Sequence, residues 1–526
     1  MRGLLRRVTL PEALVLAALA AVSCVSLVLV LVRAAEKGGT WAGGDGLLVT
    51  DQLQYLNWLR QAGHHVAVAN LYDLAPGPRS FVHPGVLLSG LLDRLGLGIR
   101  LAYLVWKPVA VLALWAGVLL LARRFLARAG DRTLALVLAL LACSPAAALV
   151  GWTGWGGPGT HFQFDFASGE VWPGFSLSGY EFSALAVAAV PLGLLAYERG
   201  REGDARWVGL AALAGLLAAW LQPWQGATYA GVLVVAELGG RRAEGRPWRA
   251  SARTLLPALA ATGAPLVYYL ALSRLDASWR LAGLVNELPR WPWWVSLAVL
   301  GPLGLPALLA YARRPRDWGE WALRAWVPMG LLVFVQPAGT FPAHAFQGLE
   351  LPLAVLAVAG VRERLLGARA LGLAPCALVV AVLVVPGTAY RIDRFAGELA
   401  ADRQAFVLRP GERAGLAFLA RDPRPGGVLA PVYSGAVIPA WTGRETWIGA
   451  GSWTPDYEAR RRATESLFEG HLGRRAAGAL VRRSGAAFLL TDCHHPAGRR
   501  LALGSVAGPP RRFGCAAVYR VRPVSP

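Results

Sequence analysis

The N-terminal stretch MRGLLRRVTLPEALVLAALAAVSCVSLVLVLV (1–32) places three arginines before an apolar run of membrane-spanning length. About 20 consecutive apolar residues are needed to cross a bilayer as a helix. The run is too long for a typical signal peptide and has no obvious cleavage site, which favours an uncleaved signal-anchor. Similar runs follow along the chain, and we expect helices because backbone polar groups in lipid must be satisfied within the segment.

The composition of the whole chain agrees with this interpretation. Of its 526 residues, 55% are hydrophobic and 16% charged, and the mean hydropathy of +0.43 is too high for a soluble enzyme of this size. The net charge of +21 does not indicate nucleic-acid binding, because the arginines lie mostly in loops between apolar runs and in the C-terminal portion. We expect a polytopic α-helical membrane protein with about eleven transmembrane helices. The predicted spans are residues 11–33, 99–122, 133–151, 179–197, 206–221, 225–239, 253–272, 293–312, 323–337, 346–361 and 368–388, and 84–97 is a short or re-entrant helix.

The placement of arginine predicts the orientation of the spans. If the N-terminal arginines are cytoplasmic, every loop that should then be cytoplasmic is arginine-rich, as the positive-inside rule requires. The predicted cytoplasmic loops are 123–132, 197–206, 239–253, 312–324 and 362–369, and the predicted outer segments are 34–98, 152–178, 273–292, 337–345 and everything after 389.

The C-terminal tail is long enough for a small domain. We expect a transmembrane module over residues 1–389, with outer loops 34–98 and 152–178, and an extracytoplasmic α/β domain over 390–526. Cys493 and Cys515 both lie in this domain, where a disulfide is permitted, but the sequence leaves their pairing open. The predicted strands are 426–432, 486–492 and 515–522, and 457–470 is the predicted helix.

A carboxylate lies in the first segment after the signal-anchor, VTDQLQYLNWLRQAGHH (49–65). Apolar and polar side chains separate onto two sides at helical spacing, which predicts a helix along the membrane interface with Tyr55 and Trp58 at headgroup level. Asp51, with Gln54 three residues later, also fits an N-cap in a capping box. A cap and a catalytic base are compatible, since a helix N-terminus favours an ionised carboxylate.

Two short motifs in this region belong to a recognisable pattern. Tyr55, a candidate substrate-binding residue, follows Asp51 by four residues, and His83–Pro84 opens the next hydrophobic segment. Together with the signal-anchor, ten or more spans and an outer C-terminal domain, this architecture resembles the GT-C superfamily of membrane glycosyltransferases. At the residue level the resemblance rests on segments 45–60, 81–98, 346–357 and 438–456.

The resemblance implies a specific chemistry. Members of the superfamily transfer a sugar from a polyprenyl-phosphate donor to an acceptor at the outer face, and an acid in the first outer loop acts as general base or aligns the acceptor hydroxyl. Asp51 takes this role here, and Asp45, among glycines, is the second candidate. A carboxylate can accept the hydroxyl proton, and the lipid phosphate that leaves needs positive charge or hydrogen-bond donors. No second acid adjoins Asp51 in a paired motif, which argues against a metal ion, and we expect no cofactor.

The second outer loop carries polar residues among aromatic ones and glycines. His161 and Asp165 are candidate substrate-binding residues, because aromatic rings can stack on sugars while acids bind hydroxyls. The alternative is an interfacial loop with aromatic anchors. A metal site formed by His161 and Asp165 lacks any convincing ligand spacing.

Several basic residues are candidate ligands of the lipid phosphate. Lys107 lies inside a predicted span, where a charge is costly and indicates a function, although its side chain could also reach the membrane surface. Arg274, Arg280 and Arg290 are competing candidates near the outer surface, or belong to a solvated charged loop.

Three further candidates lie near the outer ends of spans. His83 and His344 are substrate-binding candidates with structural roles as the alternative, and Glu350 is expected to line the same cavity. The pair His494–His495 lacks the additional spaced ligands that a metal site needs.

The sequence therefore favours an integral membrane glycosyltransferase of the plasma membrane, with a cytoplasmic N-terminus. Its expected partners are a polyprenyl-phosphate-linked sugar, a glycan, lipid or protein acceptor, and membrane lipid, with no nucleic acid. Two alternatives stay open, a transporter or flippase of a lipid-linked glycan and a non-catalytic relative that acts as a scaffold. The transporter would require more charges in mid-span and internal repeats.

Overall fold

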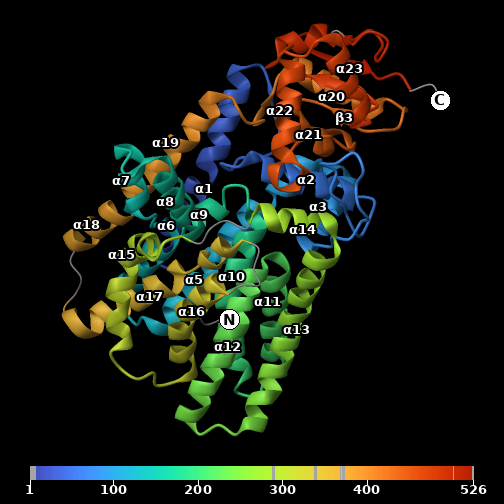
Figure 1. The fold of residues 1–526 in the computed structure, drawn as a ribbon. Coiled ribbons are helices and arrows are strands. Elements are labelled where there is room, and N and C mark those ends of the chain that lie inside the picture. Colours follow the sequence, from blue (N-terminus) through green and yellow to red (C-terminus); the bar gives the residue numbers. More distant parts are fainter. Residues whose placement is uncertain are drawn as a thin grey trace. The chain divides into compact units, whose positions relative to one another are not determined.

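The structure, a computed structural model, describes residues 8–286, 291–336, 341–367, 369, 373–501 and 503–523. The chain forms two compact units. We call residues 1–25, 106–270 and 288–394 the bundle unit, and residues 26–105, 271–287 and 395–526 the mixed unit. Figure 1 shows the long helices and the small C-terminal domain region of the chain.

The regular secondary structure in the described residues of the bundle unit is all helical. Its core packs α10 against α5 and α11, α15 against α17, and α12 against α16. The helices are α5 (Trp106–Phe125), α6 (Ala129–Leu141), α7 (Pro145–Thr153), α8 (Gly157–Val171), α9 (Pro173–Ser176), α10 (Glu181–Gly200), α11 (Ala205–Leu221), α12 (Pro223–Glu244), α15 (Trp293–Tyr311), α16 (Trp318–Val335), α17 (Glu350–Val361) and α18 (Leu373–Leu383). Three long helices run through both units, α1 (Leu10–Glu36), α13 (Trp248–Leu275) and α19 (Val385–Ala401).

Each of the eleven predicted spans coincides with a helix or a pair of helices. In the described part of the chain, seven helical stretches are long and apolar enough to cross a membrane, and the bent pair α6–α7 would be an eighth. The chain is a multi-pass membrane protein, but the count of eleven is not confirmed. Helix α11 is too short, and α12 and α16 do not reach the same apolar length.

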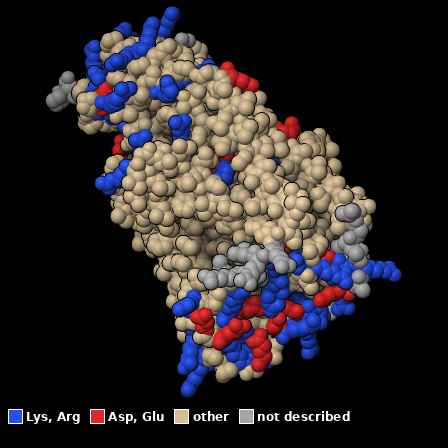
Figure 2. All heavy atoms as spheres, turned by 180° about the vertical axis from the view of Figure 1, so that it is seen from behind, with Lys and Arg blue, Asp and Glu red and all other residues tan. Residues whose placement is uncertain are grey.

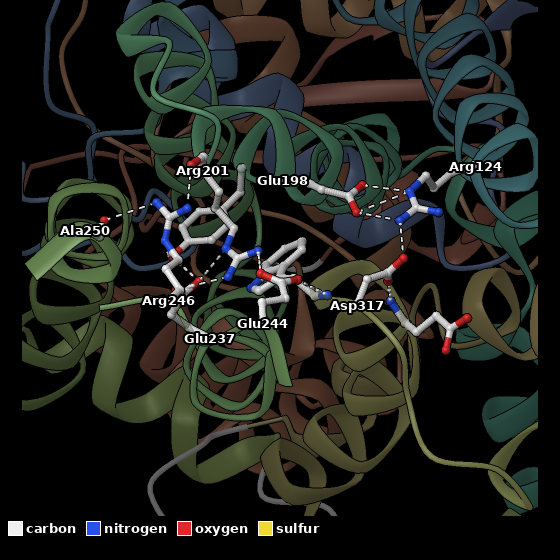
Figure 3. Close-up of polar contacts among 11 residues, drawn as sticks. Arg124, Glu198, Arg201, Glu237, Glu244, Arg246, Ala250 and Asp317 are labelled. Atoms are coloured by element: carbon white, nitrogen blue, oxygen red, sulfur yellow. Dashed lines mark hydrogen bonds and ion pairs between the residues drawn. The ribbon is translucent and has the colours of Figure 1, made fainter. Parts of the chain in front are cut away.

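Charged side chains gather in some regions and leave a broad uncharged surface elsewhere (Figure 2). In the bundle unit, the arginine-rich loops meet through ion pairs. Arg124 bonds Glu198 and Asp317, both at 2.8 Å, and so joins the C-terminal ends of α5 and α10 to the N-cap of α16. Next to it, Arg201 bonds Glu237 at 3.0 Å (Figure 3). These loops therefore lie at one end of the bundle unit.

The mixed unit combines a small sheet with helices from distant parts of the chain. The four-stranded sheet has the order β3-β4-β6-β5, with β3 parallel to β4 and the other pairs antiparallel. Its strands are β3 (Val428–Leu429), β4 (Phe488–Thr491), β5 (Arg511–Phe513) and β6 (Ala516–Arg520), and its helices include α2 (Val49–Ala62), α3 (Pro84–Leu92), α4 (Ile99–Leu104), α14 (Ala277–Val285), α20 (Pro410–Arg421), α21 (Val432–Thr442), α22 (Tyr457–Phe468) and α23 (Arg474–Ser484).

The predicted strands at 426–432, 486–492 and 515–522 and the helix at 457–470 are confirmed as β3, β4, β6 and α22. The structure also pairs Cys493 with Cys515, which resolves the alternative left open by the sequence. The tail does not form a compact unit alone, however. Strand β1 (Thr40–Trp41) pairs with β2 (Val407–Leu408), and α2 packs on α21, so the first outer loop shares its core.

Candidate active site

Helix α2 carries the candidate base. It begins at Val49 with Leu48 at the N-cap position, and no side chain caps it. The capping-box alternative for Asp51 is therefore wrong, because the helix starts two residues before it and places Asp51 inside the first turn. Asp51 is half-buried there. The helix N-terminus still favours its ionised form, since the first turn carries partial positive charge.

The polar side of α2 is buried and internally hydrogen-bonded. Asn57 donates to Gln54 at 3.2 Å, and Gln61 donates to Asn57 at 3.1 Å and to the carbonyl of Ala69 at 3.0 Å. Both sides of α2 therefore pack inside the mixed unit, while its position along the membrane interface stays a prediction. Trp58 is only 6% exposed and contacts other aromatic rings.

Asp51 shares a face of α2 with Tyr55, whose ring stacks on Tyr103 with centroids 5.8 Å apart. Tyr72 lies near this face. Its hydroxyl donates to the carbonyl of Ala436 at 2.8 Å, and burial raises its pKa, with the negative charge of Asp51 adding to the effect. The carboxylate of Asp51 therefore acts electrostatically on a buried phenol.

The second candidate, Asp45, is 3% exposed and lies in a tightly packed turn. Its backbone N–H donates to Oε1 of Gln52 at 2.7 Å. Gly43 adopts a φ of +126°, and a Cβ there would come within 2.3 Å of Leu56. The glycines around Asp45 therefore allow close packing and do not make the segment loose.

His83 has a defined structural role. It is the N-cap of α3, and its Nδ1 accepts a hydrogen bond from the backbone N–H of Val86 at 3.2 Å. At 4% exposure the ring is held inside the mixed unit. Its proposed part in substrate binding remains a prediction.

In the bundle unit, α8 places Asp165 between two arginines of α19. Asp165 is 4% exposed, and its two carboxylate oxygens accept from Arg391 at 2.7 Å and from Arg394 at 2.8 Å. Gly169 makes room for this arrangement, because a Cβ there would meet the Arg391 guanidinium at 3.1 Å. One carboxylate facing two guanidinium groups leaves a net positive charge, which suits an anion. His161, one turn earlier, bonds the hydroxyl of Tyr390 at 2.5 Å.

A second buried polar group on α8 holds His344. Glu170 is 2% exposed and bonds Nδ1 of His344 at 2.9 Å and Nε2 of Gln347 at 2.7 Å. Gln222 continues this network to Gln347 at 3.1 Å. The structure thus brings His161, Asp165 and His344 to one helix and its partners.

Lys107 is fully engaged inside the bundle unit. Its ammonium pairs with Glu181 at 3.4 Å and donates to the carbonyls of Ser23 and Leu177. Its side chain is 4% exposed, so it does not reach a membrane surface. Binding of a lipid phosphate there would require this pair to open.

The other candidates are more scattered. Glu350 is 3% exposed and lines a small cavity with Cys143 and Ser144, and its Oε2 has no hydrogen-bond partner in the described part of the chain. Arg274 and Arg280 are exposed. Arg290 lies outside the described residues. Among the residues that the structure describes, no three His, Cys, Asp or Glu side chains are placed to hold a metal ion.

The overall arrangement is similar to that of solved membrane glycosyltransferases. The oligosaccharyltransferase of Archaeoglobus fulgidus, tethered with an acceptor peptide, matches with a TM-score of 0.55 and 13% identity over 92% of this chain and 69% of that chain. The arabinofuranosyltransferase AftD from mycobacteria matches with a TM-score of 0.55 and 16% identity over 97% of this chain and 40% of that chain. The chain has the GT-C fold. No protein-family model and no curated protein sequence matches it.

The prediction of a GT-C fold is confirmed. The sequence did not, however, reveal every residue of the buried polar groups around Asp165 and Glu170. Arg391 and Arg394 were missed, because they follow the predicted span 368–388 and there look like ordinary charges outside the membrane. Gln347 and Gln222 carry no local signal, because neutral amides in apolar runs become recognisable only through their partners.

Proposed function

We propose that this protein is an integral membrane glycosyltransferase that transfers a sugar from a polyprenyl-phosphate donor to a glycan, lipid or protein acceptor. The observation that carries the proposal is the GT-C fold over more than nine-tenths of the chain, with an acid in the first turn of α2. A structure of the Archaeoglobus fulgidus enzyme contains a dolichol-phosphate, which supports a lipid-linked donor for this fold.

Asp51 is the proposed general base. As the acceptor hydroxyl attacks the anomeric carbon of the donor, the carboxylate accepts the hydroxyl proton, and the bond to the lipid phosphate breaks with its electron pair on the phosphate. The partial positive charge at the N-terminus of α2 favours the ionised carboxylate that a general base needs.

The lipid phosphate that leaves needs compensating positive charge. Within the bundle unit, Arg391 and Arg394 carry an excess of one positive charge over Asp165, so they are further candidate phosphate ligands, with Asp165 as the residue that positions them. Lys107, Arg274, Arg280 and Arg290 remain candidate phosphate ligands. Tyr55, His83, His161, His344 and Glu350 remain candidate substrate-binding residues, and Asp45 the second candidate base.

The finer topology is also part of the proposal. The N-terminus and the ion-paired loops of the bundle unit would be cytoplasmic in the plasma membrane, and the tail extracytoplasmic, because the positive-inside rule places arginine-rich loops in the cytoplasm.

Asp51→Asn tests the proposal. We expect sugar transfer from a panel of radiolabelled polyprenyl-phosphate sugars to a membrane-glycan extract to fall by about a hundredfold to ten-thousandfold, the usual contribution of a general base. The amide is nearly isosteric and no cap is lost, so the unfolding midpoint in detergent should stay close to that of wild type.

Asp73→Asn is the matched control, since Asp73 is a half-buried carboxylate of the same unit that pairs with Arg460 at 3.1 Å. It should retain transfer. Equal transfer by folded Asp51→Asn and wild type would remove Asp51 from the mechanism. No transfer by wild type, with transport of a lipid-linked glycan into vesicles instead, would favour the transporter.

A further inference from the structure

Four aromatic rings from separate segments of the mixed unit meet beside α2. The ring of Trp279, on α14, has centroid distances of 4.8 Å to Phe81, 5.1 Å to Trp453 and 6.2 Å to Trp58. Trp58 in turn lies 4.5 Å from Phe81 and 5.3 Å from Trp453. We call these four residues the aromatic platform.

The platform has a buried floor and a more open side. Trp58 and Phe81 are buried, at 6% and 4% exposure, whereas Trp279 and Trp453 are half-buried. Large rings that stay partly open to solvent, although closely packed neighbours surround them, are typical of a ligand-binding surface.

Hydrogen bonds fix the backbone segments that carry the two open rings. Asp276 caps α14 and accepts from the backbone N–H of Trp279 at 3.1 Å, and it also bonds Ser80 at 2.5 Å. Asn70 donates to the backbone carbonyl of Trp453 at 2.7 Å. Such fixed positions lower the ordering cost when a ligand binds.

Polar groups border the platform. Ser452, next to Trp453, lies 3.2 Å from the side chain of Asn286, which ends α14. Arg280, next to Trp279, is exposed. A ligand at the platform therefore meets ring faces and, at the edge, hydroxyl, amide and guanidinium groups that can serve hydroxyls.

The platform lies on the same face of α2 as the proposed base. Asp51, Tyr55 and Trp58 have the spacing i, i+4 and i+7, which forms a single stripe on a helix. At 1.5 Å per residue, Asp51 and Trp58 are about 10 Å apart along the helix axis. A single sugar ring cannot bridge this span, but a short oligosaccharide can.

We infer that the acceptor is an oligosaccharide that extends along this stripe, with its reacting hydroxyl at Asp51 and an inner sugar residue on the aromatic platform. The inference rests on the proposed function and narrows the acceptor from glycan, lipid or protein to a glycan of more than one residue. The C–H faces of the inner sugar stack on Trp279 and Trp453, and its hydroxyls bond the polar border.

The test measures binding separately from transfer. Octyl glycosides with one to four glucosyl, mannosyl or arabinofuranosyl residues are titrated by calorimetry against the full-length protein in a sugar-free zwitterionic detergent. We expect affinity to rise with chain length for at least one series. Trp279→Ala and Trp453→Ala should each weaken the longer glycosides by about tenfold, the order expected for one aromatic contact, and leave the one-residue glycoside unchanged.

Trp279→Phe keeps a ring and should restore part of the loss. Trp293→Ala, which removes a 76%-exposed tryptophan of the bundle unit, is the control and should bind like wild type. Absence of binding by every glycoside, or length-dependent binding that neither alanine variant weakens, would overturn the inference.

Asp51→Asn separates this inference from the proposed function. Length-dependent binding that depends on Trp279, with transfer lost only in Asp51→Asn, supports both. If wild type binds the glycosides in this way but transfers no sugar, the aromatic platform is supported as a binding site and the proposed glycosyltransferase activity is contradicted. Transfer to a peptide alone, with no glycoside bound, keeps the enzyme and overturns the glycan acceptor.

Discussion

At the scale of single residues, substitutions in the pair Lys107–Glu181 can show whether Lys107 has a structural role or binds the lipid phosphate. Both side chains are almost fully buried, and each is the other's counter-charge at 3.4 Å. Lys107→Met should lower the free energy of unfolding by about 3–5 kcal/mol, because it leaves a buried carboxylate uncompensated. Lys107→Met combined with Glu181→Leu should recover most of this loss, as measured by unfolding in detergent.

The double variant also tests the phosphate hypothesis for Lys107. If the lysine is structural, the refolded double variant should bind polyprenyl phosphate as wild type does. Loss of that binding in a stable double variant would show that Lys107 reaches the lipid phosphate. Failure of the second substitution to restore stability would show that the carbonyls of Ser23 and Leu177, and not Glu181, are its main partners.

The candidate residues themselves were only partly accessible from the sequence. Asp51, Asp165 and His344 could be selected because acids and histidines among apolar residues are conspicuous. Their partners could not, since Arg391 lies 226 positions from Asp165 in the chain and Glu170 lies 174 from His344. Such pairings depend on how helices pack, which residue spacing does not encode.

At the scale of elements, Glu412 links the start of α20 to the end of β4. Its carboxylate accepts from the backbone N–H of Arg409 at 2.8 Å and of Cys493 at 3.1 Å. The pKa of Glu412 is raised to about 7, mainly by burial and in part by the nearby charge of Asp492, although those two backbone hydrogen bonds and the Arg409 charge act in the opposite direction. Nε2 of His494 lies 3.8 Å away, and burial lowers the pKa of His494.

A raised carboxyl pKa gives the mixed unit a defined pH dependence. The unfolded chain loses this proton near its model value of 4.5, whereas the folded chain holds it to about 7. The protonated Glu412 therefore contributes about 3 kcal/mol to the free energy of unfolding. This contribution is complete below pH 4.5 and is lost as the pH rises to about 7. Unfolding in detergent from pH 4.5 to 8 should show the decline.

Glu412→Gln is the variant that isolates this effect. It removes the titration, so the slope over this range should flatten, while one lost backbone acceptor lowers stability at every pH by about 1–2 kcal/mol. An unchanged slope in the variant would assign the pH dependence to other groups. His495, whose pKa Asp492 raises, would then be the next candidate, because its contribution is also lost as pH rises.

The boundaries of elements show where local patterns end. The strands β3, β4 and β6 were predictable because they are apolar runs between turn residues. Strand β5 was not, since Arg511 and Arg512 are exposed at the edge of the sheet and give no apolar signal. The capping pattern would place the N-cap of α2 at Asp51, three residues after the observed N-cap at Leu48.

At the scale of the whole molecule, the sequence predicted the positions of the long helices well, but it did not predict which segments pack together into one compact unit. Apolar length is a local property, so every predicted span coincides with a helix or a pair of helices. The division into units is not local, since β1 pairs with β2 across more than 360 residues of sequence. No composition shift along the chain marks such a junction.

Topology is the last property that arginine placement predicts. With Cys24, Cys143 and Cys376 replaced by serine, Glu202→Cys marks the loop 197–206 and Arg475→Cys marks the tail, and both positions are exposed. The disulfide between Cys493 and Cys515 does not react with maleimide and can stay. In intact cells, a membrane-impermeant maleimide should label Arg475→Cys, and it should label Glu202→Cys only after permeabilisation.

The reason is that the ion-paired loops still leave an excess of arginine, which the positive-inside rule retains in the cytoplasm. Labelling of Glu202→Cys in intact cells, with Arg475→Cys protected, would invert the proposed orientation. It would also place Asp51 on the cytoplasmic side if α1 spans the membrane, because an odd number of spans would then separate it from the N-terminus. Transfer at the outer face requires the first result.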